Sequence, residues 1–445
     1  MSLFKPISIS LSPNTEKDDI WLALRLLFRP WCWRKEQLED GPLTALEEEF
    51  EKYLGVKSAI SFNSGRSAFL AILNCLELEK ESEVLLQAFT CNAAVNPIIW
   101  SGLKPIFVDC DEKTFNIDIE DLKRKITPKS EVVMVQHTFG LPADLDEILE
   151  ICRQNNLILI EDCAHSLGAE YGSRAERENH PAPSLEGAGS TTFQPRFASG
   201  KVGTFGKAAF FSFSRDKVIS SVYGGMAVTD DEELAKKLKE YQEKIGSPSY
   251  FWIFQQLLHP ILMNWLILPT YKILGKYLLI LFQWLQILSK ALHWKEKRGK
   301  KPGYFPKRLP NALACLALNQ FKKLERFNNH RKEIADFYYN ELKGTSFELP
   351  QNLENRKQIF LRFTIKHLKA RQIIEKAWQK NLLIGDWYDK VIAPHDTKLE
   401  KMQYLLGSCP KAEKLSKETF NLPTHINISQ KEAKKIIDFL KKYGD

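Results

Sequence analysis

The stretch Leu157–His165, LILIEDCAH, indicates the fold class. It consists of a run without a polar residue that ends in the adjacent carboxylates of Glu161 and Asp162. A strand that is apolar on both sides is typical of a parallel sheet covered by helices. Ligands of such sheets bind at the carboxyl ends of the strands. The stretch therefore predicts a buried strand that delivers a carboxylate to a binding site, although an Asp in this place can also simply cap the next turn.

Similar short apolar runs recur on both sides of this stretch, and helical or polar segments separate them. The runs are Val84–Phe89, Pro105–Val108, Val132–Gln136 and Ala208–Phe213. This alternation predicts a mostly parallel sheet covered on both faces. We expect four parts: an N-terminal amphipathic segment (1–40), a large α/β domain (41–246), an apolar helical insertion (247–301) and a small C-terminal α+β domain (302–445).

Three further features of the chain bear on this plan. Helices are expected at 45–53, 68–76, 311–342 and 428–442, and a strand is expected at 359–365. The stretch 173–201 is rich in Ser, Gly, Pro and Ala and predicts a surface loop.

Composition narrows the function classes. The chain has 445 residues, 44% of them hydrophobic, and a formal net charge of +8, which suits a globular protein but selects no partner. The eight cysteines form no C-x-x-C pair, so reduced thiols in a cytoplasmic protein are expected, without a disulfide or metal site. No signal peptide is evident. No basic stripe with interleaved aromatics spans the α/β region, which disfavours nucleic acid as a partner.

A second motif, Phe62–Ser67 (FNSGRS), precedes an apolar helix. Ser-Gly at a helix start offers backbone N–H groups and the positive end of the helix dipole to an anion. A plain capped helix is the alternative. Arg66 favours the anion site at Gly65 and Arg66, because a cation in the first turn is unfavourable unless an anion lies beside it.

A third motif, Ala208–Lys217 (AAFFSFSRDK), is followed by Gly224 and Gly225. A lysine just beyond a buried strand can have its pKa lowered, as Schiff-base chemistry requires. Most lysines are surface groups, so the position of Lys217 alone leaves that reading open. Paired glycines allow the backbone to approach a ligand closely.

In their order along the chain, the three motifs resemble the DegT/StrS family of sugar aminotransferases, which are fold-type I enzymes that depend on pyridoxal phosphate. The resemblance runs from about residue 41 to 244 and from about 303 to the C-terminus. It extends to Lys104–Asp109, Asn116–Asp118, Cys409–Ser416 and Leu422–His425.

The resemblance implies roles for individual residues. Lys217 would carry the cofactor covalently and move the proton of the substrate. Asp162 would hold the pyridinium nitrogen of the cofactor, which keeps the ring an electron sink. His165 would lie beside the ring.

The resemblance also implies how the phosphate is held, by Ser212 and the backbone at Gly65 and Arg66. Arg66 stands where relatives usually have threonine, so an ionic phosphate contact is expected. Arg308 would reach the site of a second subunit, which implies a homodimer. Cys91 stands where relatives often place an aromatic residue over the ring, which leaves open what covers that face.

The expected reaction is transfer of an amino group from an amino acid, expected to be glutamate, to a keto-sugar that is nucleotide- or lipid-linked. It would serve cell-surface polysaccharide or secondary metabolite biosynthesis. One alternative is a sugar dehydratase of the same family, which carries histidine in place of the lysine. The other is a membrane-associated regulatory protein without turnover.

The insertion at 247–301 has an unusual composition, because no Asp or Glu occurs between Glu243 and Glu296. It is rich in Leu and Trp and ends in a cluster of cations, and Trp21–Arg34 has a similar make-up. Such segments suit the headgroup region of an anionic membrane. The prediction is peripheral contact on the cytoplasmic face of a membrane, with packing against a partner subunit as the alternative.

Overall fold

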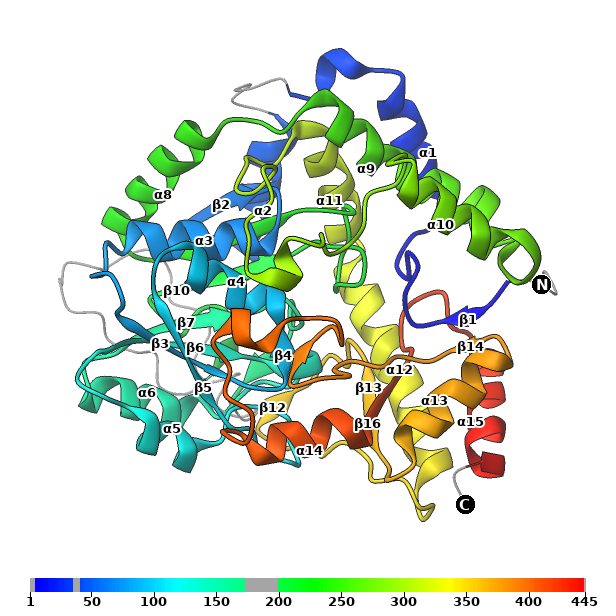
Figure 1. The fold of residues 1–445 in the computed structure, drawn as a ribbon. Helices are drawn as coiled ribbons and strands as arrows, with labels where there is room; N and C mark the ends of the chain where they lie inside the picture. Colours follow the sequence, from blue (N-terminus) through cyan, green and yellow to red (C-terminus); the bar gives the residue numbers. More distant parts are fainter. Residues whose placement is uncertain (1–4, 35–40, 173–198, 444–445) are drawn as a thin grey trace.

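The computed structural model describes residues 5–34, 41–172 and 199–443, and a seven-stranded sheet lies at its centre (Figure 1). The strand order is β2-β11-β10-β7-β6-β3-β5. The bounds are β2 Ser58–Phe62, β3 Glu83–Gln87, β5 Lys104–Val108, β6 Ser130–Gln136, β7 Ile158–Asp162, β10 Ala208–Ser212 and β11 Gly225–Thr229. Strand β11 is antiparallel to both of its neighbours, and the pairs from β10 to β5 are parallel. The predicted α/β class with a mostly parallel sheet is confirmed.

Helices cover both faces of the sheet, which explains why its strands lack polar alternation. In β6, Met134 packs in one core with α3 (Gly65–Cys75), and Val133 packs in another core with α6 (Leu145–Gln154). Each fully buried side chain of this size stabilises the fold by about 1.5–3 kcal/mol relative to an exposed one. The remaining helices of the large domain are α2 Pro42–Leu54, α4 Asn92–Trp100, α5 Ile119–Lys125 and α8 Glu232–Ile245.

The C-terminal part combines helices with the antiparallel pair β13 (Phe363–Lys366) and β16 (Thr419–Leu422). Its helices are α11 Asn311–Phe321, α12 Leu324–Leu342, α13 Ala370–Gln379, α14 Pro410–Glu418 and α15 Gln430–Tyr443. Ser429 opens α15 as predicted, since its hydroxyl accepts the N–H of Glu432 at 3.3 Å. The helix expected over 311–342 is two helices.

The strand expected at 359–365 is wrong in its first half, because β13 begins only at Phe363. The N–H groups of Ile359 and Leu361 donate instead to the carbonyls of Gly140 and Phe139, at 3.2 and 3.1 Å. The first residues of this stretch therefore tie the C-terminal part to the large domain instead of extending its own sheet.

The insertion is largely helical, as expected. Helix α9 (Tyr250–Leu262) continues through π-helical turns at Met263–Ile267 and Tyr271–Gly275 into α10 (Lys276–Trp284). Among the described residues no single helix is long and apolar enough to cross a membrane, whereas the pair Tyr250–Ile267 and Tyr271–Trp284, bent by 111°, passes by length and composition.

Short pairings connect the remaining segments. Strand β1 (Ile7–Ser8) lies parallel to β14 (Leu382–Leu383), and β4 (Thr90–Cys91) lies parallel to β15 (Ile392–Ala393). Helix α1 (Lys17–Leu27) lies beside α9 (Figure 1). Of the predicted loop at 173–201, residues 173–198 lie outside the described part, and Gly200–Lys201 forms β9 against β8 (Glu170–Tyr171). The domain boundaries stay predictions.

Candidate active site

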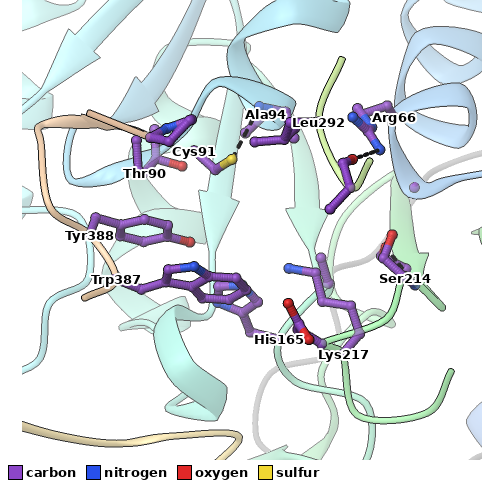
Figure 2. A pocket seen from close by; sticks show the side chains of 18 of the residues that line it. Arg66, Thr90, Cys91, Ala94, His165, Ser214, Lys217, Leu292, Trp387 and Tyr388 are labelled. Atoms are coloured by element: carbon purple, nitrogen blue, oxygen red, sulfur yellow. Dashed lines mark hydrogen bonds between the residues drawn. The ribbon is translucent and has the colours of Figure 1, made fainter. Parts of the chain in front are cut away.

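A cavity of about 280 Å³ lies at the carboxyl ends of the parallel strands and collects most of the predicted site residues (Figure 2). The predicted residues that line it are Gly65, Arg66, Asp162, His165, Ser212 and Lys217. Arg308 does not line it: its N–H donates to the carbonyl of Gly246 at 3.0 Å. The roles given to these residues stay predictions, but the chain does bring six of the seven together.

Lys217 follows β10 and points into the cavity toward Trp387 and His165 (Figure 2). Its Nζ lies 5.1 Å from the centroid of the Trp387 ring. Burial lowers the pKa of the Lys217 amine to about 8, while the Asp162 carboxylate opposes this shift. An amine in this range is present in its neutral, nucleophilic form at a useful fraction near neutral pH.

Two buried side chains hold the backbone of the Lys217 segment from behind. Asn14 Nδ2 donates to the carbonyls of Lys217 and Val218, at 2.5 and 3.1 Å. Arg331 Nη2 donates to the same Val218 carbonyl at 2.7 Å and to Asn14 Oδ1 at 3.0 Å. Asn14 is 1% exposed and Arg331 0%, so the loop rests on a dry, hydrogen-bonded support.

Asp162 ends β7, directly beside β10, because Phe210 pairs with Asp162 in the parallel register. The Asp162 side chain is buried, and Oδ1 accepts the N–H of Ala164 at 2.9 Å. Burial raises the pKa of this carboxyl, and Lys217 acts in the opposite direction. Asp162 therefore caps the turn after β7 and also lines the cavity, and its role toward a ligand stays a prediction.

His165 lies in a stack of aromatic rings. Its imidazole is nearly parallel to Phe139, at 8° and 5.9 Å between centroids, and to Trp387, at 18° and 5.6 Å. Burial, followed by the positive charge of Lys217, lowers the pKa of His165 well below its usual value. Nδ1 accepts the Phe139 N–H at 3.4 Å, so the neutral ring carries its proton on Nε2.

The expected anion site lies where α3, β10 and β11 converge. Ser64 caps α3, and its Oγ accepts the Ser67 N–H at 3.0 Å. A Cβ on Gly65 would lie 2.9 Å from the Cβ of Ser212, and one on Gly225 would lie 2.3 Å from the Gly65 nitrogen. Both glycines are therefore required for the close approach that forms this cup.

Arg66 has a different partner from the one expected. Its guanidinium forms an ion pair with Glu296, which is completely buried, and Nη2 donates to the Ala291 carbonyl at 3.3 Å. Although burial opposes the charge, the Glu296 carboxylate raises the pKa of Arg66. The anion that a cation in this first turn demands is supplied by the protein, so the argument for an ionic phosphate contact loses its basis.

The insertion contributes a wall of the cavity through Ala291 and Leu292, which sequence reasoning did not foresee. Arg215 fastens this wall by donating to the carbonyl and the hydroxyl of Ser289, at 2.7 and 2.5 Å. Tyr223 adds a bond from its hydroxyl to the Lys290 carbonyl at 2.6 Å. The long run without acids gave a composition signal but no hint of this contact.

Trp387 is a further cavity residue that the sequence analysis did not identify. Cys91 lines the same cavity without an aromatic ring, and its Sγ accepts the N–H of Ala93 at 3.5 Å. Trp387 reaches the cavity from the C-terminal part, and the Arg362 guanidinium lies 3.3 Å from the centroid of its indole. Its only signal in the sequence was an aromatic pair, Trp387-Tyr388, shortly before the cavity-lining Pro394.

Comparison with known proteins relates this chain to a family of aminotransferases. The family model described as the DegT/DnrJ/EryC1/StrS aminotransferase family matches residues 30–252 and 283–441. The GDP-perosamine synthase of Caulobacter vibrioides is 33% identical over 197 residues, 44% of this chain and 46% of that protein. The chain thus spans about half the length of the curated relatives that share 33–35% identity with it.

Two further comparisons cover nearly the whole chain. The UDP-N-acetyl-3-dehydro-alpha-D-glucosamine 3-aminotransferase of Acidithiobacillus ferrooxidans is 26% identical over 399 residues, 89% of this chain and 87% of that protein. The structure of Helicobacter pylori PseC, an aminotransferase involved in the biosynthesis of pseudoaminic acid, superimposes with a TM-score of 0.70 at 20% identity, over 99% of both chains. Because the family model matches most of the chain, the protein belongs to the DegT/DnrJ/EryC1/StrS aminotransferase family.

Proposed function

We propose that this protein is a pyridoxal-phosphate-dependent aminotransferase that moves an amino group from an amino acid, expected to be glutamate, to a keto-sugar carried on a nucleotide. The observation that carries the proposal is that Lys217, with a pKa of about 8, and Asp162 line the same cavity, with Asp162 at the end of β7 and Lys217 just beyond the neighbouring parallel strand β10. The names of two relatives, a GDP-sugar and a UDP-sugar enzyme, support the substrate class. The name of a third relative, the spore coat polysaccharide biosynthesis protein SpsC of Bacillus subtilis, favours a place in polysaccharide biosynthesis.

The residues of the cavity fit pyridoxal phosphate. The volume of the cavity, about 280 Å³, is near the lower end of the range for small-molecule sites. The glycines at 65 and 225 let the start of α3 lie directly against the ends of β10 and β11, and Gly65, Arg66 and Ser212 line the cavity there, where the free N–H groups of a helix start suit a phosphate. Since Glu296 neutralises Arg66, we assign phosphate binding to the backbone at the start of α3 and to Ser212.

When bound, pyridoxal phosphate supplies an electron sink that makes the C–H bond beside the amino group acidic. Lys217 would hold the cofactor and, once displaced, would accept and return the proton at the substrate carbon. Asp162 would hold the proton at the ring nitrogen, because a buried carboxylate stabilises a neighbouring cation. The neutral imidazole of His165 would stack beside the ring without adding a second charge.

The test of this function starts with the loaded protein. Borohydride reduction and peptide mapping should place the cofactor on Lys217. A separate, unreduced sample is incubated with glutamate and GDP-, UDP- or dTDP-linked keto-sugars. Mass spectrometry should detect an amino-sugar among its products, and Lys217→Ala should give none. A label on another lysine, or an unchanged yield from the variant, would overturn the assignment. If the amine forms only on a lipid-linked keto-sugar, the carrier is wrong and the reaction stands.

A homodimer with shared sites belongs to the same proposal, supported by the position of Arg308 outside the cavity of its own chain. Mixing Arg308→Ala with Lys217→Ala tests it. If Arg308 acts in the partner's site, mixed dimers contain one site with both residues, and activity returns. If Arg308 acts in its own chain, the mixture stays inactive.

The proposed location is the cytoplasm. All eight cysteines are unpaired, as expected in a reducing compartment. Labelling of the partly exposed Cys32 by a membrane-impermeant thiol reagent tests this location, since it should occur only in permeabilised cells.

A further inference from the structure

Two segments that the family model does not match lie together on one face of the protein. The match omits residues before 30 and residues 253–282, and these contain α1 and most of α9 and α10. In the fold α1 lies against α9 (Figure 1), and Trp21 meets Trp265 edge to face with 5.6 Å between ring centroids. We call the outer face the surface formed by α1, the turn at 30–32, and the stretch that runs from α9 through the π-helical turns and α10 to Leu285.

The outer face carries most of the large apolar side chains that the described part of the chain exposes. The most exposed are Trp284 at 75%, Phe28 at 72% and Trp31 at 69%. The others are Trp21, Tyr250, Phe251, Phe254, Trp265, Ile273, Leu274, Tyr277, Ile280, Leu281 and Leu285. Large apolar side chains exposed in this number on neighbouring elements mark an interaction site.

The inner side of α1 and α9 is ordinary protein core. Trp252, Ile253 and Leu257 of α9 are buried in one cluster with Ile20 of α1 and Leu313 of α11. The helices are thus fixed on the domain by one side, and the opposite side is left for a partner.

The charges of the outer face have one sign. Arg25, Arg29, Lys272 and Lys276 are exposed there, and no acid lies between Glu243 and Glu296. The acids of α1 point elsewhere: Asp18 pairs with Lys323 of the C-terminal part at 2.6 Å, and Asp19 with the same Lys323 at 3.1 Å.

This charge pattern selects the occupant. A second copy seated symmetrically on the outer face would bring like charges together, because a two-fold interface uses the same patch on both subunits. Trp, Tyr and Leu side chains with cations and without acids are instead the composition of a surface that lies in the headgroup region of an anionic bilayer.

We infer that the outer face docks the protein on an anionic lipid bilayer. The docked surface is close to the cavity, since Ala291 in the cavity wall follows exposed Leu285 by only six positions. At no more than ~3.6 Å per residue, these two positions are at most about 22 Å apart. The inference is independent of the substrate, and its test needs no turnover.

The test is co-sedimentation of the full-length holoenzyme with phosphatidylcholine vesicles, with and without phosphatidylglycerol. The parent should bind the anionic vesicles at low salt and be released only in part by high salt, because apolar contacts remain. Lys272→Gln/Lys276→Gln should weaken partitioning about 30-fold, from about 5-fold per lysine. Leu281→Ser/Leu285→Ser should weaken it about 10-fold or more.

Matched controls keep each change in kind and move it elsewhere. Leu405→Ser/Leu406→Ser alters side chains that are 76% and 70% exposed outside the outer face, and Lys80→Gln/Lys129→Gln alters exposed lysines of the large domain. Both controls should bind as the parent does, and every variant should retain the parent's melting temperature and cofactor.

Three results would overturn the inference. The first is that the parent stays in the supernatant at low salt, and the second is that the outer-face variants bind vesicles as well as their controls do. Alternatively, light scattering would show that the outer-face leucine variant lowers the oligomeric state while the parent ignores vesicles, which would make this face a protein interface.

Discussion

Glu296→Gln should release the wall of the cavity. This carboxylate is 0% exposed and pairs with Arg66, which is 7% exposed. Removing one member of a buried ion pair costs about 3–5 kcal/mol, because the remaining charge is left without a partner. Glutamine can still accept the His293 N–H that Glu296 accepts at 2.7 Å, so we expect the lower end, about 3 kcal/mol.

Limited proteolysis measures this loss where it occurs. Around and after the wall the chain carries five trypsin sites, at Lys290, Lys295, Lys297, Arg298 and Lys300, because trypsin does not cleave the bond between Lys301 and Pro302. When opening and closing are fast, cleavage reports the population of the open segment. A loss of about 3 kcal/mol should therefore speed cleavage about 150-fold, at 1.36 kcal/mol for each factor of ten.

Two variants make the experiment decisive. Asp396→Asn breaks the exposed pair that Asp396 forms with Lys297 at 2.6 Å and should speed cleavage no more than about 5-fold. Arg66→Met/Glu296→Leu removes both buried charges and should recover most of the lost protection, since apolar replacements of such pairs are often neutral. Parent-like cleavage of Glu296→Gln, or a double variant as fragile as the sum of its single variants, would refute the pairing. Cofactor release from Arg66→Met shows in addition whether Arg66 contacts phosphate.

The remaining predictions concern the cavity. Because burial lowers the pKa of Lys217 to about 8, the amine becomes neutral as the pH rises through that value, and capture of pyridoxal phosphate by the apoprotein should accelerate there. In Asp162→Asn the midpoint of this pH profile, followed by absorbance, should move to lower pH, since the carboxylate favours the charged amine; an unmoved midpoint contradicts the pairing. The same variant should keep the fold and lose transamination about 100-fold or more, whereas parent-level turnover would leave Asp162 as a strand-end cap. Gly225→Ala should lower cofactor retention and melting temperature, because the new Cβ would lie 2.3 Å from the Gly65 nitrogen; Gly303→Ala, with nothing within 4 Å, is its control, and equal behaviour of the two refutes the close-approach argument.

Much of the fold could be predicted because its information is local. The run 157–160 is apolar at every position, and in the structure β7 has helices over both faces. The position of Asp162 and Lys217 follows from this, since the carboxyl ends of parallel strands meet at one edge. The strand expected to begin at Ile359 failed for the opposite reason, because its backbone pairs with a turn more than 200 residues earlier.

The missed parts of the site depend on packing between distant segments. That an anion lies beside Arg66 was predictable from the helix dipole, but its identity was not, because Glu296 lies 230 residues away. Trp387 likewise enters the cavity through the pairing of β15 with β4, which no local pattern announces. A position on a strand end can be read from sequence, whereas a neighbour brought by a long connection cannot.

The support behind Lys217 has a consequence for biosynthesis. Asn14 and Arg331, which hold the carbonyls of Lys217 and Val218, are 317 positions apart in the chain. At about 5–20 residues per second a ribosome needs roughly 16–63 s to make the stretch between them. The lysine itself is translated well before its support is complete, so in the nascent chain its loop is unsupported and its amine lacks the burial that lowers its pKa. Cofactor should therefore be captured late, after Arg331 has left the exit tunnel.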